Sequence, residues 1–103
     1  GGSQMVTLEM FKDGKSIQDI ANERELAEST ITSHLAQFIA TGELEAIQLM
    51  EENKFHELKD LMEKTKFEGF GELKNKIDNK FTYADIKIVY NSMEYAKSLK
   101  LKE

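Results

Sequence analysis

The 103-residue chain contains no cysteine, no proline and no tryptophan. Without cysteine it can form neither disulfide bonds nor cysteine-ligated zinc sites, and such a composition is compatible with a reducing compartment. The chain also lacks an apolar run approaching the roughly 20 residues of a membrane-spanning helix, and its N-terminus does not resemble a signal peptide. We therefore expect a cytoplasmic protein without a membrane partner.

Residue types suited to catalysis are scarce as well. His34 and His56 are the only histidines, and Gly69 and Gly71 lack the lysine and hydroxyl residue that follow the glycines of a nucleotide-binding loop. We expect His34 to be half-buried, with its ring hydrogen-bonded to a carbonyl or water, and His56 to lie on the outer face of a helix. The sequence predicts no catalytic residue, no metal site and no cofactor.

Length and composition favour a single helical domain. A chain of 103 residues can bury a modest core, and 40% hydrophobic residues without proline suit a helical bundle. Gly1, Gly2 and Ser3 are typical of residues that remain after removal of an affinity tag. We expect residues 4–97 to form one domain, with residues 1–3 outside it and residues 98–103 as a frayed tail.

Residues 4–44 have the pattern of three helices arranged as a helix-turn-helix. The first helix spans about residues 4–13 and ends at Gly14, and the second begins at Ser16, whose hydroxyl can accept a hydrogen bond from the Asp19 amide. Residues 24–26 form the turn before the third helix at residues 28–40, which Gly42 closes. The predicted core residues recur with helical spacing: Leu8, Phe11, Ile17, Ile20, Ala21, Leu26, Ile31, Leu35, Phe38 and Ile39.

The turn departs from the usual pattern at Glu25. Glycine is more common at this place because the backbone requires a positive φ, and glutamate in that conformation costs on the order of 1 kcal/mol. Glu25 also adds a negative charge beside the second and third helices.

Residues 45–97 are predicted to extend this core with about three further helices. The apolar run at residues 44–50 fits either a strand or a helix, and we treat it as extended. Helices are expected at residues 52–65, at residues 72–78 and after Thr82, which caps the last helix together with Asp85. The side chains predicted to be buried are Phe55, Leu58, Leu61, Met62, Phe67, Phe70, Leu73, Ile77, Tyr83, Ile86, Val89, Tyr90 and Met93. The predicted fold is all-α, a small bundle built on the helix-turn-helix.

Several segments together resemble a known family. The order GKSIQDIA, ERELAESTITSHL and TGEL, followed by ELKNKI and FTYADIKIVYNSM, resembles the helix-turn-helix domain at the C-terminal end of many bacterial RecQ-type DNA helicases and in related stand-alone proteins. The resemblance covers about residues 7–93 and is most specific at residues 14–44 and 83–89. RecQ-type helicases unwind duplex DNA with ATP during recombination and repair, but their motor domains have no counterpart in this chain.

The resemblance implies an accessory, non-catalytic DNA-binding module of a RecQ-type helicase, located with the nucleoid. Its implied partners are DNA, the remaining helicase domains and a repair protein. If the helix at residues 28–40 reads DNA, its outward side chains enter the major groove. Those facing away from the core are predicted to be Ala27, Glu28, Ser29, Thr32, Ser33, Ala36 and Gln37.

The predicted DNA contacts are Ser29, Thr32, Ser33 and Gln37 for base edges, and Lys12, Lys15 and Arg24 for phosphates. Hydroxyls can bond a base edge or a phosphate, and Gln37 can pair with adenine, but the reading helix has no arginine or lysine for guanine. The same polar side chains are also ordinary on a solvated helix face, so contact with DNA stays open.

Charge argues against strong DNA binding by the N-terminal half alone. Residues 1–52 carry three basic and ten acidic side chains, a net charge of −7, whereas residues 53–103 carry eleven lysines and nine acids, a net charge of +2. Because nonspecific affinity comes mainly from cations that displace counterions on phosphate, an acidic reading half should bind duplex DNA weakly. The lysines of the second half are spread among acids, which favours a solvated surface over a basic patch.

Two other functions stay open. The acidic helix-turn-helix can dock onto a basic surface of its own helicase or of a repair partner through complementary charge. A stand-alone transcription regulator would normally be a dimer, and the sequence shows no heptad or other dimerisation helix.

Overall fold

The computed structural model describes residues 2–102, which form six α-helices, one short 3₁₀ helix and no β-strand. The elements are α1 (Gly2–Lys12), α2 (Ile17–Arg24), α3 (Glu28–Ala40), η1 (Ala46–Gln48), α4 (Glu52–Lys64), α5 (Phe70–Lys76) and α6 (Tyr83–Leu101). The predicted all-α fold is confirmed. Gly1 and Glu103, parts of the predicted tag remnant and tail, lie outside the described residues. No α-helix within residues 2–102 combines the length and apolar character that a membrane crossing requires.

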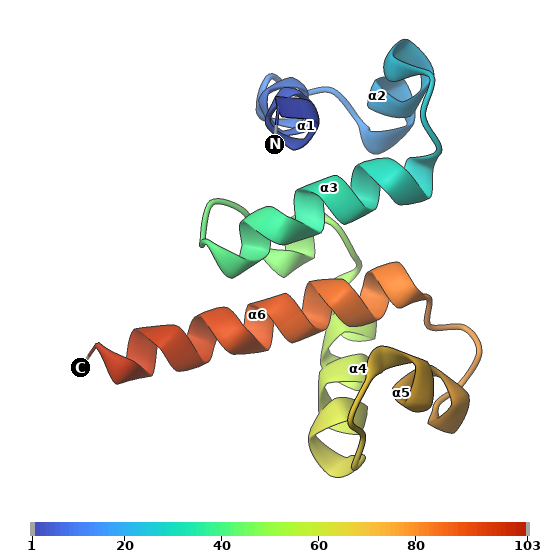
Figure 1. The fold of residues 1–103 in the computed structure, drawn as a ribbon, viewed down its shortest axis with the longest axis vertical. Coiled ribbons are helices and arrows are strands. Elements are labelled where there is room, and N and C mark those ends of the chain that lie inside the picture. The colour runs from blue at the N-terminus through green and yellow to red at the C-terminus, as the bar shows by residue number, and fades with distance from the viewer. Residues whose placement is uncertain (1, 103) are drawn as a thin grey trace.

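The longest helix, α6, joins the two halves of the molecule. α3 lies between the α1–α2 pair and α6, while α4 and α5 pack on the other side of α6 (Figure 1). Two hydrogen bonds join α3 and α6: Lys87 Nζ donates to the Ser33 carbonyl at 3.4 Å, and Asn91 Nδ2 donates to the Ala36 carbonyl at 2.9 Å. Since the residue numbers of the partners rise together, the two helices run parallel. α6 therefore flanks the predicted reading helix along its length.

The buried side chains form two hydrophobic clusters that meet at α6. The first unites α1, α2, α3 and η1, and the second unites α4, α5, Phe81 and α6. Ile88 of α6 belongs to the first cluster, whereas Ile86 and Val89 belong to the second, and all three are at most 1% exposed. α6 is thus buried on two sides, which a single apolar stripe does not predict.

Two helix starts follow directly from local sequence. The Ser16 hydroxyl accepts a hydrogen bond from the Asp19 amide at 3.0 Å, as predicted, and begins α2. At α6 the Asp85 amide donates to the Thr82 hydroxyl and the Thr82 amide donates to the Asp85 carboxylate, both at 3.0 Å. The single cap at Ser16 and the reciprocal box of Thr82 and Asp85 satisfy amides that a helix start otherwise leaves without partners.

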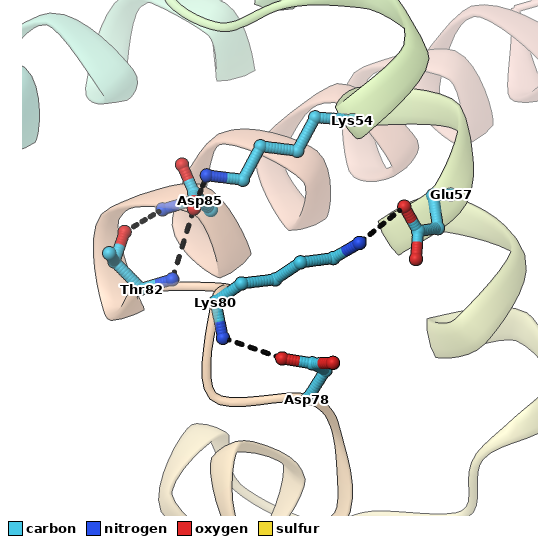
Figure 2. A network of polar contacts seen from close by, with 6 residues as sticks. All are labelled: Lys54, Glu57, Asp78, Lys80, Thr82 and Asp85. Carbon is cyan, nitrogen blue, oxygen red and sulfur yellow. Dashed lines mark hydrogen bonds and ion pairs between the residues drawn. The ribbon is translucent and has the colours of Figure 1, made fainter.

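The Thr82 box also anchors α4 to α6 (Figure 2). Lys54 Nζ lies 3.0 Å from the Asp85 carboxylate, and Lys80 Nζ donates to Glu57 at 2.9 Å. The hydrogen bond to Glu57 raises the pKa of Lys80 above its usual value. The two ammonium groups lie 6.0 and 5.2 Å from the centre of the buried Phe81 ring. These lysines hold the start of α6 against α4.

Gly42 is required both by its backbone and by its neighbour. Its φ is +84°, a left-handed conformation that favours glycine, and a Cβ at this position would lie 2.5 Å from the Tyr95 hydroxyl oxygen. The turn after α3 is therefore built for close approach of α6.

The extended conformation predicted for residues 44–50 is wrong. Residues 46–48 form the 3₁₀ helix η1, and the Met50 amide donates to the Ala46 carbonyl at 3.1 Å. Glu45 and Gln48 form a reciprocal capping box, with the Glu45 amide donating to Gln48 Oε1 at 2.8 Å. The Glu45–Gln48 box stabilises the helical turn, whereas the periodicity of the apolar run did not distinguish a helix from a strand.

The two ends also differ from the prediction. Gly2 and Ser3 form the first turn of α1, and α6 continues to Leu101 instead of fraying from Ser98. Tyr83 and Tyr90, predicted on the buried side of α6, are 56% and 37% exposed. The reason is that α3 and α4 cover α6 from two directions, which buries Asp85 and Ile88 and leaves the tyrosine side open.

Candidate nucleic-acid interface

The turn between α2 and α3 has the conformation expected from the sequence. Glu25 has the left-handed angles φ 55° and ψ 44°. Its amide donates to the carbonyls of Ala21 and Asn22 and so caps the C-terminal end of α2. The Leu26 amide donates to the Ala21 carbonyl at 3.0 Å, and the Leu26 side chain packs against the first cluster. The left-handed residue thus redirects the chain from α2 into α3 over residues 25–27.

Neighbouring helices cover α3 on two sides. The Thr7 hydroxyl of α1 lies 2.9 Å from His34 Nδ1, and Asn91 of α6 donates to the Ala36 carbonyl on the opposite side. Ala36 is fully buried, so its predicted position on the outward face is wrong. α6 occupies the space into which Ala36 was expected to point.

An exposed stripe remains on α3, formed by Ser29, Ser33 and Gln37. These residues are spaced four apart and therefore lie along one face of the helix. Ser29 and Gln37 are exposed, and Ser33 is half-buried beside Lys87. Thr30, which the sequence-based prediction omitted, is half-buried next to Ser29 in the first turn. The α3 stripe contains only side chains that can both donate and accept hydrogen bonds.

Thr32, another predicted contact, lies away from the α3 stripe. Its hydroxyl donates to the Glu28 carbonyl at 3.0 Å, so its hydrogen is used within the helix. The start of α3 has no side-chain cap, but Glu28 places a negative charge in the first turn. The Glu28 carboxylate interacts favourably with the helix dipole, but its negative charge repels a phosphate that would bind the same amides.

Two of the three cations predicted to contact phosphate have partners within the protein. Lys15 Nζ lies 2.7 Å from both carboxylate oxygens of Glu23. Arg24 donates to the Ser3 carbonyl at 2.7 Å and to the Thr7 hydroxyl, so it ties the end of α2 to α1. Lys12 ends α1, exposed and without a salt bridge in the part of the chain that is described.

His34 of α3 lies close to the positive charges of Arg24 and Lys87. It is half-buried as predicted, but its ring partner is the Thr7 hydroxyl instead of a carbonyl or water. Burial lowers the pKa of His34 below its usual value of 6.5, and the positive charges of Arg24 and Lys87 lower it further. Lys87 therefore lies beside the α3 stripe, 54 residues away in sequence from its partner Ser33. Only the tertiary fold brings it there.

Among residues 2–102, no group of three or more histidine, cysteine or acidic side chains is placed to hold a metal ion. His56 lies on the outer face of α4, as predicted, with its Nε2 3.7 Å from a Glu52 carboxylate oxygen. The exposed position of this pair leaves the α3 stripe as the main candidate surface.

Comparison with known proteins agrees with this geometry. A protein-family model described as a helix-turn-helix domain matches residues 3–90. The match extends from α1 into α6 and so includes both α3 and Lys87. No curated protein and no solved structure matches the chain.

Proposed function

Because the chain belongs to the helix-turn-helix domain family, which suggests DNA binding, we propose that it is a DNA-binding module that is not catalytic by itself. The observation that carries this proposal is the α3 stripe, which stays open to solvent between α1 and α6. Lys87 stands on one side of it and can contact a phosphate while Ser29 or Gln37 contacts a base edge.

The packing of α6 limits how α3 can meet DNA. A major groove about 12 Å wide admits one helix of about 10–12 Å diameter, whereas α6 runs alongside α3 as a second helix. The N-terminal end of α3 therefore enters the groove first, with Ser29 and Thr30 leading. Lys87 of α6 then faces the phosphates at the groove edge.

We assign the module to a RecQ-type DNA helicase acting in recombination and repair. This assignment rests on the sequence resemblance over residues 7–93, especially residues 14–44 and 83–89. A net charge of −7 on residues 1–52 makes the module's own affinity for duplex DNA weak, so the helicase supplies most cations and the ATP-driven motor. In this proposal the module is located with the nucleoid, where its helicase binds DNA.

Fluorescence anisotropy with a labelled duplex at several salt concentrations tests DNA binding. We expect Lys87→Gln to weaken binding about fivefold at low salt, equivalent to ~1 kcal/mol. The slope of log K against log salt should fall by about one. Replacing Ser29 and Gln37 together with glutamate should abolish binding, because two negative charges would face the groove.

Lys64→Gln is the matched control for Lys87→Gln. It removes the same charge from the C-terminal end of α4, an exposed position, and should leave duplex affinity within about twofold of the unmodified chain. Absence of duplex binding at low salt, or equal effects of the two lysine substitutions, would contradict the proposed interface.

A second function is favoured by the acidic character of the N-terminal half. Glu9, Glu25, Glu28 and Glu43 are exposed, so this half presents negative charge that can orient a basic protein surface. In that case the module docks onto its own helicase or a repair partner. Salt-sensitive binding to the isolated helicase motor, lost when Glu25 and Glu28 become glutamine, would support docking over DNA reading.

The third function, a stand-alone transcription regulator, requires the two-fold arrangement of paired half-sites. Multi-angle light scattering decides this question, because a monomer at micromolar concentration would exclude such a regulator.

A further inference from the structure

A row of three side chains on α6 lies outside both buried clusters of the fold. Tyr83, Lys87 and Tyr90 are spaced four and three residues apart, so they lie along one face of the helix. We call this row the α6 ridge. Tyr83 is 56% and Tyr90 37% exposed, whereas Asp85 and Ile88 on the opposite side of the helix are buried. The ridge thus presents two aromatic rings with a cation between them.

The rings are held in place from the α5 side. The Phe70 and Tyr90 ring centres lie 5.1 Å apart at an interplanar angle of 71°, an edge-to-face pair. A Cβ placed on Gly71 would come 4.0 Å from the Tyr83 hydroxyl, so Tyr83 lies against the start of α5. The two tyrosines are supported by neighbouring residues while part of each ring stays accessible.

The α6 ridge adjoins the α3 stripe through Lys87. The Lys87 ammonium group donates to the Ser33 carbonyl, and Ser33 is the middle residue of the α3 stripe. A strand leaving a duplex bound at α3 would therefore pass Lys87 and reach the tyrosines. Nearby on α6, Glu94 is paired with Lys97 at 3.1 Å, which moderates its repulsion of phosphate.

We propose that the α6 ridge binds unpaired nucleotides of a DNA strand next to the duplex, by stacking bases on Tyr83 and Tyr90. This inference rests on the proposed DNA-binding function. Seven residues of helix place the two rings about 10 Å apart, room for two or three bases at the ~3.4 Å spacing of one strand. Each base presents a flat π-face, and Lys87 contacts the phosphate between them. The preferred ligand is then a forked or tailed duplex.

Anisotropy with two labelled probes tests this inference: a blunt duplex, and the same duplex with an oligothymidylate tail about 12 nucleotides long. We expect the tail to strengthen binding about tenfold and Tyr83→Ala to remove most of that gain, as expected from loss of one stacked base. Tyr83→Phe keeps the ring and should retain the gain. Met5→Ala is the control, because Met5 is a comparably exposed apolar side chain (46%) on α1.

Intrinsic fluorescence gives an independent measurement, because the chain has three tyrosines and no tryptophan. Stacking should quench tyrosine emission when oligothymidylate is added, and Tyr83→Ala should reduce the fraction quenched. Binding of the blunt duplex without any gain from the tail, or a gain that Tyr83→Ala leaves intact, would overturn the ridge as a base-stacking site. Absence of blunt-duplex binding would instead refute the proposed function.

Discussion

Replacement of Asp85 by alanine should destabilise the protein by about 2 kcal/mol. The carboxylate accepts the Thr82 amide at the start of α6 and pairs with Lys54 at 3.0 Å, while its side chain is only 13% exposed. Loss of the capping interaction costs about 1 kcal/mol. Loss of the partly screened ion pair costs up to ~1 kcal/mol, because the Lys54 side chain is 33% exposed and can turn to water. The cost stays below the ~3–5 kcal/mol of a stranded buried charge for the same reason.

Urea unfolding followed by circular dichroism measures this loss. A destabilisation of about 2 kcal/mol should lower the midpoint by about 1–2 M urea. Asp85→Asn keeps an acceptor for the Thr82 amide and should lose only about half as much. A double-mutant cycle with Lys54→Met should give a coupling energy of up to ~1 kcal/mol. If Asp85→Ala costs less than about 0.5 kcal/mol, or the cycle shows no coupling, the network does not anchor α6 as we describe.

Two further outcomes follow from the turn after α3 and from His34. Gly42→Ala should lower the free energy of unfolding by about 2 kcal/mol, since its φ of +84° disfavours alanine and a Cβ would collide with Tyr95. In thermal unfolding, Gly2→Ala should be nearly neutral, because a Cβ added at Gly2 would meet no side chain or distant backbone within 4 Å; equal effects of the two substitutions would contradict this account. The pKa of His34 is lowered in the folded protein, so the unfolded chain binds a proton more readily and the folded state loses stability as pH falls below 6.5. Unfolding at about pH 7.5 and about pH 5 should therefore show a larger loss for the unmodified chain than for His34→Gln, and a parallel loss would refute it.

Local signals predicted much of this fold, and tertiary packing explains the errors. The cap at Ser16 and the box at Thr82 involve residues three apart, so the sequence contains the whole interaction. The positive φ of Glu25 was also predictable from the turn. In contrast, the burial of Ala36 depends on α6, more than 40 residues away in sequence.

The candidate interface shows the same division. Serine and glutamine spacing identified the α3 stripe, because helical periodicity is local. The engagement of Arg24 with Ser3 and Thr7, and the arrival of Lys87 beside Ser33, involve segments distant in sequence. A single apolar stripe on α6 predicts Tyr83 and Tyr90 on its buried side, but both side chains are exposed. Because α6 packs against two clusters, its exposed face is not the one opposite a single apolar stripe.

The position of α6 also bears on how this molecule can be divided. A fragment ending at residue 44 would keep α1, α2 and α3 but would lose Ile88 and the side of α6 that shields Ala36. The bared surface would be apolar and would favour self-association over an isolated three-helix unit. Transplanting the α2–α3 element into another protein would thus require a substitute for α6. The C-terminal helix α6 is therefore a structural part of the N-terminal unit, although the two lie at opposite ends of the sequence.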